Sequence, residues 1–233
     1  MITTWLTGAP DPSKWGYDIG NGSNGWGNEE KQYYTNRTEN SVVQNGALRI
    51  VLKKENFSGF NYTSARLLTA NKFSFKYGII EARAKLPAGG GTWPAIWSLG
   101  ANIGSVGWPA CGEIDIMEYW GSNVISSAVH HPIDGNLSID EYVANYQYKD
   151  GVTSDFHTYA LEWNNERITL SVDGINHLNY EPLIKNQFTW PFDAEQYILL
   201  NIAILSNVPA NFIQSTMEID YVRVYQEASL ANT

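Results

Sequence analysis

The chain has 233 residues, of which 43% are hydrophobic and 13% aromatic, and its formal net charge at pH 7 is −9. This length and apolar content suit one large domain, because all-β domains often reach 200–250 residues. The 15 Lys and Arg residues against 24 Asp and Glu residues leave no basic surface, so we expect neither nucleic acid nor anionic lipid as a partner.

Short β-forming segments separated by turn signals dominate the chain. In chain order, strands are expected at residues 47–53, 64–68, 72–75, 78–86, 95–98, 113–118, 124–130, 157–163, 167–172, 197–203 and 216–225. The pairs Asn45-Gly46 and Asp173-Gly174 are typical of tight turns, and the second predicts a β-hairpin. No amphipathic helix of ten residues, internal repeat or run of 18 apolar residues is present. The pattern predicts a single domain over residues 1–233, an all-β sandwich or jelly roll that does not span a membrane, with a frayed tail at 229–233.

Residues 112–120 read Gly-Glu-Ile-Asp-Ile-Met-Glu-Tyr-Trp, so three acids lie within six positions of an otherwise apolar strand. Removing an ionised carboxylate from water is costly unless the group is paired or its pKa shifts. The run therefore indicates either a metal site or a polar cleft where carboxylates act on a bound substrate. A strand end whose acids face solvent is the plainer alternative.

The spacing of the three acids can be tested against strand geometry. Side chains alternate along a strand, so Glu113 and Asp115 share one face, while strict alternation turns Glu118 toward the core. A β-bulge at Ile116–Met117 would return Glu118 to the face of the other two acids, and bulges recur beside active sites. Two glutamates leaning together can then approach to about 5–5.5 Å, the separation that retaining glycosidases use.

Other ionisable and sulfur-bearing groups give weaker signals. The four histidines are scattered and Cys111 is the single cysteine, so we expect no transition-metal site and no intrachain disulfide. We expect Cys111 to be a buried small hydrophobe. The neighbouring Glu29 and Glu30 lie in a Gly- and Asn-rich loop, which favours a solvated position at the rim of a site.

Several sequence blocks, taken in order, resemble a known family. They are Trp-Gly-Asn-Glu-Glu at 26–30, Tyr-Thr-Ser-Ala-Arg at 62–66, Glu-Ala-Arg-Ala-Lys-Leu-Pro at 81–87, Trp-Pro-Ala-Ile-Trp at 93–97, Trp-Pro-Ala-Cys-Gly at 108–112 and Ile-Asp-Tyr-Val-Arg-Val-Tyr at 219–225. With the acidic strand, they resemble the laminarinase-like branch of glycoside hydrolase family sixteen. The resemblance covers most of the chain from Trp15 onward.

The resemblance implies a fold and an activity. The fold is a β-jelly-roll sandwich of two curved antiparallel sheets, concanavalin-like, with a concave substrate cleft. The activity is retaining endo-hydrolysis of β-1,3-glucosidic bonds in β-glucans such as laminarin, with no cofactor for catalysis. Carried over by position, Glu113 is the nucleophile, Glu118 is the general acid/base, and Asp115 orients the nucleophile.

The resemblance also implies which side chains bind glucose units. The candidates are Trp93, Trp97, Trp108, Asn28, Arg66 and His130. Of Trp93 and Trp97, we expect one to stack on sugar and the other to belong to the core. Arg66 is either a hydrogen-bond donor to the substrate or part of a salt bridge beneath the cleft, and His130 is either near the acid/base residue or an ordinary buried histidine.

A structural Ca²⁺ is common on the convex side of this family, and the resemblance implies Asp220 as its carboxylate ligand. Gly46 is a candidate carbonyl donor, since Ca²⁺ prefers oxygen ligands. Three segments depart from the family pattern. Residues 1–14 replace an opening strand that supplies a calcium oxygen, residues 203–210 lack a tryptophan-bearing loop, and residues 133–149 differ in sequence. Because residues 203–210 lack that loop, we expect an altered sugar subsite at the end of the cleft where the loop would lie.

Two alternative functions stay open. The same chemistry suits mixed-linkage β-1,3-1,4-glucan or a galactan, although the few Lys and Arg residues disfavour a sulfated polymer. A non-catalytic glucan-binding module shares the fold, but such relatives typically lose the catalytic glutamates that this chain keeps. The expected partner is a β-glucan polysaccharide or oligosaccharide, met by a monomer. Residues 1–5 lack the basic and apolar regions of a signal peptide, so either the protein is cytoplasmic or its leader is not part of this sequence. We expect the second case, a secreted or extracellular protein.

Overall fold

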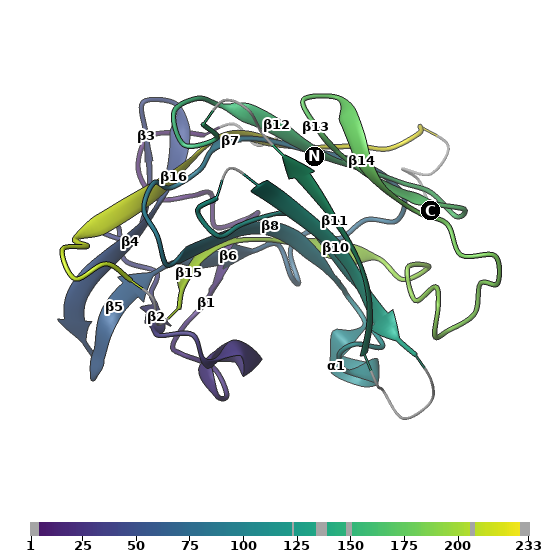
Figure 1. Ribbon diagram of the computed structural model, residues 1–233, viewed down its shortest axis with the longest axis horizontal. Coiled ribbons are helices and arrows are strands. Elements are labelled where there is room, and N and C mark those ends of the chain that lie inside the picture. The colour runs from purple at the N-terminus through teal and green to yellow at the C-terminus, as the bar shows by residue number, and fades with distance from the viewer. Residues whose placement is uncertain (1–4, 123, 134–138, 148–150, 206–207, 229–233) are drawn as a thin grey trace.

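The structure is a computed structural model that describes residues 5–122, 124–133, 139–147, 151–205 and 208–228. Its strands form two sheets that lie as stacked, curved layers (Figure 1). In spatial order, the seven-stranded sheet contains β1 (Gly16–Asp18), β6 (Arg66–Leu68), β15 (Gln196–Ile204), β8 (Thr92–Gly100), β9 (Glu113–Tyr119), β10 (Val124–Pro132) and β11 (Ile139–Gln147).

The second sheet has nine strands. In spatial order they are β14 (Ile175–Tyr180), β13 (Ile168–Val172), β12 (His157–Trp163), β7 (Gly78–Lys85), β16 (Gln214–Tyr225), β4 (Ala47–Phe57), β5 (Phe60–Ser64) and β2 (Gln32–Tyr34), while β3 (Ser41–Gln44) pairs with β4 beside this path. The pairing is antiparallel throughout except between β2 and β5, which are parallel. The predicted all-β sandwich of two sheets is confirmed.

The inner faces of the two sheets pack into a common hydrophobic core. Leu161 of β12 and Ile114 of β9 are both fully buried in this core, although they come from different sheets. Trp163 is 1% exposed and meets Phe75 edge-on, with ring centroids 5.7 Å apart. Burying an aliphatic or aromatic side chain of this size contributes about 1.5–3 kcal/mol, so the core holds both sheets rigidly behind their outer faces.

Local turn chemistry sets the hairpins. Asp173 and Gly174 connect β13 to β14 with φ values of 49° and 78°, and Asn45 and Gly46 connect β3 to β4 with φ values of 54° and 79°. Positive φ at both central residues is the signature of the type I′ turn, whose twist matches that of the two strands it joins. The hairpin predicted at Asp173-Gly174 is confirmed.

Some elements differ from the sequence prediction. The strand prediction was wrong at residues 72–75, where two backbone N–H groups bond the Thr69 carbonyl in a turn and Phe75 makes an isolated bridge to Gln196. The segment expected as one strand at 64–68 belongs to β5 and β6, which lie in different sheets. Strands β1, β2, β3, β11 and β14, helix α1 (Ile103–Val106) and the π-type turn η1 (Gly25–Glu29) lie outside the predicted segments. Among the described residues, no helix is long and apolar enough to cross a membrane.

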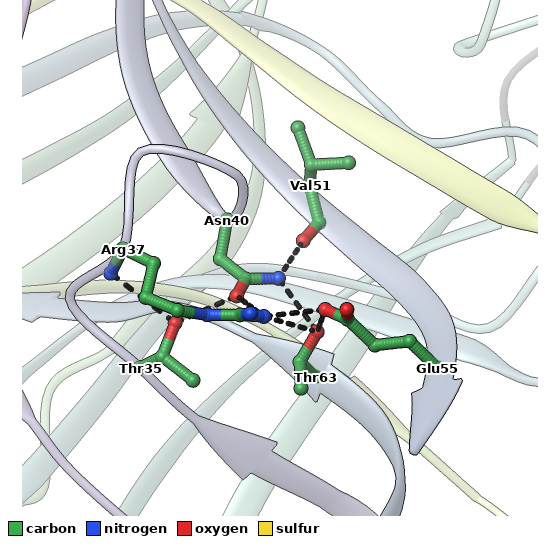
Figure 2. Close-up of polar contacts among 6 residues, drawn as sticks. All are labelled: Thr35, Arg37, Asn40, Val51, Glu55 and Thr63. Carbon is green, nitrogen blue, oxygen red and sulfur yellow. Dashed lines mark hydrogen bonds and ion pairs between the residues drawn. The ribbon is translucent and has the colours of Figure 1, made fainter. Parts of the chain in front are cut away.

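A polar network fastens the segment after β2 to the nine-stranded sheet (Figure 2). Arg37 donates hydrogen bonds to Asn40, Thr63 and Glu55, and it also forms an ion pair with Glu55. Asn40 donates to the Thr63 hydroxyl at 2.9 Å and to the backbone carbonyl of Val51 at 2.9 Å. Because buried polar groups are costly when unpaired, this network fixes the segment after β2 against β4 and β5.

Candidate active site

The acidic strand β9 lies between β8 and β10 in the seven-stranded sheet, and its pairing is interrupted by a bulge. Along β8, Ile96 pairs with Met117, but the next residue pairs with Asp115, so Ile116 is the extra residue. The pairing with β10 shifts at the same place. Ile116 and Met117 are fully buried in the core, whereas Glu118 is partly exposed. The predicted bulge at Ile116–Met117 is confirmed, and it brings the three acids to the outer face of this sheet.

Glu113 and Asp115 form a hydrogen-bonded group with His130 of β10, and Glu118 interacts with this group through charge. The His130 Nε2 atom lies 2.8 Å from Asp115 Oδ2 and 4.0 Å from Glu113 Oε1. The cross-strand register explains this contact, because His130 is the direct partner of Glu113 on the neighbouring strand. The sequence left two interpretations for His130, and the structure places it beside Asp115 and Glu113, two of the candidate catalytic acids.

Each glutamate accepts a hydrogen bond from a tryptophan indole. Trp108 Nε1 donates to Glu113 Oε2 at 2.8 Å, and Trp93 Nε1 donates to Glu118 Oε1 at 2.9 Å. Trp108 precedes β9 and is 42% exposed, so its ring is available to a ligand next to Glu113. The two indoles orient the carboxyl groups by hydrogen bonding. They do not neutralise a carboxylate charge, because an indole N–H is an uncharged donor.

Burial dominates the electrostatics of this group. Burial, with the neighbouring Asp115 charge, raises the pKa of Glu113 to about 8. Burial also raises the pKa of Glu118 to about 7. For Asp115, burial and the charge of Glu118 raise the pKa well above its usual value. Because the carboxyl groups interact, their protons belong to the set and not to one residue. The set therefore keeps protons near neutral pH, as general acid catalysis requires.

The contacts of Glu113 favour its ionised form despite this burial. The His130 charge and the hydrogen bond from Trp108 both lower the pKa of Glu113, opposing its desolvation. The pKa of Glu118 is nevertheless the lower of the two. The free site thus does not fix the shared proton on one glutamate, and its final position depends on the ligand that fills the site.

Arg66 lies close enough to Glu113 to affect its pKa, and it is held between two tryptophan rings and an aspartate. Its guanidinium lies 4.6 Å from the ring of Trp26 and 4.7 Å from the ring of Trp97, which are cation–π distances. It also forms an ion pair with Asp18 at 3.0 Å, and its side chain is 12% exposed. Of the two roles considered, the salt bridge beneath the outer face is the one that the structure shows.

Two of the remaining predicted binding residues, Trp93 and Trp97, lie on β8 beside the acidic strand. Trp97 donates through Nε1 to Asn201 Oδ1 at 2.7 Å, and like Trp93 it is partly exposed. Trp97 packs against a small hydrophobic cluster that contains Leu99 and Cys111, so it is the one of the two that contacts the core, although neither indole is fully buried. Asn28 is exposed on η1, and its amide donates to Glu30 Oε1 at 3.3 Å.

Glu30 was expected to be solvated at a rim, and this expectation was wrong. Its side chain is buried, with 8% exposure for the residue, and it accepts a hydrogen bond from Gln32 Nε2 at 2.6 Å. Burial raises its pKa. A hollow of about 500 Å³ between η1 and β5 adjoins Glu30 but contains none of the three catalytic candidates. The catalytic group therefore lies on the open outer face and not in this hollow.

The calcium candidates lie together at one end of the β4–β16 pairing. This pairing ends where Ile219 pairs with Leu48. Asp220 is the next residue on β16, and the turn that contains Gly46 leads into β4 at the same end. The Asp220 carboxylate is already paired with Arg83 at 2.6 Å, and both side chains are about 40% exposed. Any cation at Asp220 must therefore share this carboxylate with a guanidinium.

The structure adds three residues that sequence reasoning missed. Trp120 follows β9 and is 43% exposed, and Asn201 of β15 bonds both Trp97 and Tyr34. Glu141 of β11 lies 3.6 Å from His130 Nδ1. Trp120 directly follows the acidic strand in the sequence, so its position there could have indicated it as a site residue. Glu141 carries no local signal, because only the pairing of β10 with β11 brings it to the site.

The arrangement suits acid–base and nucleophilic chemistry on a ligand held against the outer face. Among the described residues, the group of three or more His, Cys, Asp or Glu side chains with converging ligand atoms is Glu113, Asp115 and His130, within 4.8 Å of one another. Glycosidases use two carboxyl groups for this chemistry, and Glu113 and Glu118 are the candidates for such a pair here.

Comparison with known proteins decides the family. The model of "Glycosyl hydrolases family 16" matches residues 28–223. The chain belongs to glycosyl hydrolase family 16. The resemblance read from the sequence blocks is thereby confirmed, and so is the jelly-roll fold expected from it. The chain is a glycoside hydrolase, and family 16 enzymes need no cofactor for catalysis.

Individual family 16 members are similar along nearly the whole chain. A beta-glucanase of Rhodothermus marinus is 41% identical over 236 residues, covering 94% of this chain and 82% of its own length. The crystal structure of a laminarinase from Flavobacterium sp. UMI-01 superposes with a TM-score of 0.88 at 38% identity, covering 97% of this chain and 99% of the other. SCLam, a non-specific endo-β-1,3(4)-glucanase, superposes with a TM-score of 0.90 at 38% identity, covering 97% and 93%.

Proposed function

We propose that this family 16 protein is a retaining endo-β-1,3-glucanase that hydrolyses laminarin-type glucans. The observation that carries the proposal is the placement of Glu113, Asp115 and Glu118 on one outer face, with an indole donor on each glutamate. The similarity to a laminarinase over 97% of this chain supports the substrate class.

In the first step, the ionised Glu113 attacks the anomeric carbon of the glucose unit whose bond breaks. A Glu113–carbon bond forms as the bond to the glycosidic oxygen breaks, and Glu118 gives its proton to that leaving oxygen. His130 and Trp108 stabilise the anionic form of Glu113, and the raised pKa of Glu118 keeps a proton available near neutral pH.

In the second step, Glu118 takes a proton from a water molecule, and the water oxygen displaces Glu113 from the anomeric carbon. Two displacements on opposite faces restore the original β configuration. Asp115 does not contact the leaving group in this scheme. It orients Glu113 through the hydrogen-bonded group that also contains His130.

The direct test incubates the protein with laminarin, lichenan, agarose and xyloglucan and measures the sizes of the products. We expect laminarin to release a ladder of oligosaccharides early in the reaction, which distinguishes endo from terminal cleavage. Proton NMR of the first products should show the β anomer before mutarotation. Early α product would contradict the retaining mechanism.

Matched variants separate the two glutamates. Glu113→Ser should abolish hydrolysis while leaving oligosaccharide binding in place, because it removes the nucleophile from an otherwise intact face. Glu118→Gln should slow substrates with poor leaving groups more than those with good ones, since it removes the proton donor. Turnover by Glu113→Ser at the parent rate would show that the nucleophile is another residue.

A second candidate substrate is mixed-linkage β-1,3-1,4-glucan. The similarity to SCLam, which is described as a non-specific endo-β-1,3(4)-glucanase, favours it. Comparable kcat/KM values on lichenan and laminarin would replace the narrower proposal with this one. Oligosaccharide binding without product release from any polymer would instead favour a non-catalytic glucan-binding module.

We further propose that the protein is secreted, since a polysaccharide is too large to enter a cell intact, and that it acts as a monomer. Culture fractionation of the source cells and light scattering of the purified protein test the two parts.

A structural Ca²⁺ at Asp220 fits the residues present only if Arg83 yields part of the carboxylate. Unfolding midpoints measured with Ca²⁺ and with a chelator should then differ more in Arg83→Ala than in the parent.

A further inference from the structure

Trp120 is a large aromatic side chain next to the catalytic strand that no part of the mechanism uses. It directly follows Tyr119, the last residue of β9, which is 4% exposed and faces the core. Alternation along the chain therefore points Trp120 to the same outer face as Glu118. Its exposure of 43% means that the protein itself does not cover this ring.

The ring of Trp120 packs against Trp93, the residue that donates a hydrogen bond to Glu118. Trp93 and Trp120 have ring centroids 5.6 Å apart with an interplanar angle of 31°. Trp93 also donates its indole N–H to Glu118. Trp120 is thus one contact away from the carboxyl group that protonates the leaving oxygen, and a sugar unit at Glu118 would meet its exposed face.

Trp120 also completes a symmetrical arrangement around the strand. In the part of the chain that the structure describes, the tryptophans with more than 40% exposure are Trp108 and Trp120, at 42% and 43%. Trp108 contacts Glu113 at one end of the acidic run, and Trp120 lies beyond Glu118 at the other. Two exposed indoles that bracket two carboxyl groups are poorly explained by packing, because exposed tryptophan contributes little to a core.

We propose that Trp120 is a specificity-determining residue whose exposed ring stacks against a glucose unit of the bound β-glucan beside Glu118. The proposal rests on the glucanase function and adds a sugar contact to it. The C–H face of a β-linked glucose ring is apolar and flat, and an indole offers a rigid apolar surface at low entropic cost.

The test measures binding of β-1,3-linked gluco-oligosaccharides of two to six units to Glu113→Ser protein by titration calorimetry. Adding Trp120→Ala should weaken binding by about tenfold for oligosaccharides long enough to reach the ring. Trp120→Phe should recover most of that affinity, since it restores an aromatic face. Tyr225→Ala is the matched control, because Tyr225 is 41% exposed on β16 of the other sheet, and its removal should change affinity less than twofold.

The outcomes separate the inference from the function beneath it. If the Glu113→Ser parent binds no oligosaccharide of any length, the proposed glucan substrate is wrong. If the parent binds but Trp120→Ala binds equally well, the inference is overturned while the function stands. Near-ultraviolet circular dichroism shows whether each variant is folded, and Trp120→Phe gives a second reading if Trp120→Ala is not. In Trp120→Ala with Glu113 intact, KM on laminarin should rise more than kcat falls.

Discussion

At the residue scale, the site consists of carboxyl groups whose neighbours either raise or lower their pKa values. Burial raises the pKa values of Glu113 and Glu118, and the charge of Glu141 adds to the increase at Glu118. Glu141 lies on β11, directly across from His130 and 3.6 Å from its Nδ1 atom. A partly solvated carboxylate at the sheet edge thus raises the proton affinity of Glu118, the proposed acid/base residue.

Removing this charge should move the alkaline limit of activity. In Glu141→Gln the loss of one negative neighbour lowers the pKa values of Asp115 and Glu118, so the interacting set of carboxyl groups gives up its proton at lower pH. The alkaline limb of the kcat/KM profile on laminarin should therefore shift to lower pH, and the shift should shrink in high salt because Glu141 is 59% exposed. Asp140→Asn is the control, since it removes the same charge from the opposite face of β11. Superimposable profiles for the parent and Glu141→Gln would contradict the prediction.

At the element scale, the catalytic strand depends on the backbone that leads into it. Gly112 immediately precedes β9 with φ at +76°, and a Cβ atom there would lie 2.8 Å from the ring of Phe192. Gly174, in the β13–β14 turn, has nearly the same φ of +78° but no atom within 4 Å of its Cβ position. The two glycines therefore share a backbone conformation that strains any residue with a Cβ atom, and they differ in the steric contact that such an atom would make.

This pair gives a matched prediction. Gly174→Ala should destabilise the protein by about 1 kcal/mol, the cost of placing alanine at positive φ. Gly112→Ala should cost about 1–3 kcal/mol more because Phe192 must shift, and it should also reduce kcat because β9 moves with it. Chemical denaturation of both variants and assays on laminarin measure the two effects. Equal stability and full activity in the two variants would show that Gly112 is replaceable.

Prediction from sequence succeeded where the physical cause is local. The Asp173-Gly174 turn and the Ile116–Met117 bulge each follow from a few adjacent residues. It failed where the cause is distant in sequence. Glu30 is buried by partners that include Tyr34 and Gln32, and Glu141 reaches the site only through strand pairing. The six binding candidates came from family resemblance, and the structure separates Arg66, which is held in a salt bridge, from the exposed Trp108.

At the scale of the whole molecule, the active site reduces stability as pH rises. The folded-state pKa of Glu113 is raised from 4.5 to about 8, so between these values the folded protein binds a proton that the unfolded chain has released. The associated stabilisation is complete below about pH 4.5 and is lost as pH rises through 8. Keeping a nucleophile in this buried group therefore destabilises the protein under alkaline conditions.

A neutral isostere should reverse this loss. Glu113→Gln should unfold at nearly the parent temperature around pH 4.5, and its midpoint should exceed that of the parent by at least about 3 °C at pH 9. Differential scanning calorimetry across this range checks the trend. Glu162→Gln is the control, because Glu162 is 52% exposed and its removal should leave the pH dependence unchanged. A constant difference between parent and Glu113→Gln at all pH values would refute the linkage.

The bulge in β9 also bears on how such a strand tolerates changes in length. With Ile116 present, the bulge turns Glu118 to the outer face. Without Ile116, regular alternation from Glu113 would bring Glu118 to that same face, now four positions along instead of five. A single insertion or deletion at this point therefore exchanges a bulged strand for a regular one while both glutamates stay on the catalytic side. The active strand can thus gain or lose a residue in evolution at the one place where a change of length does not reverse its faces.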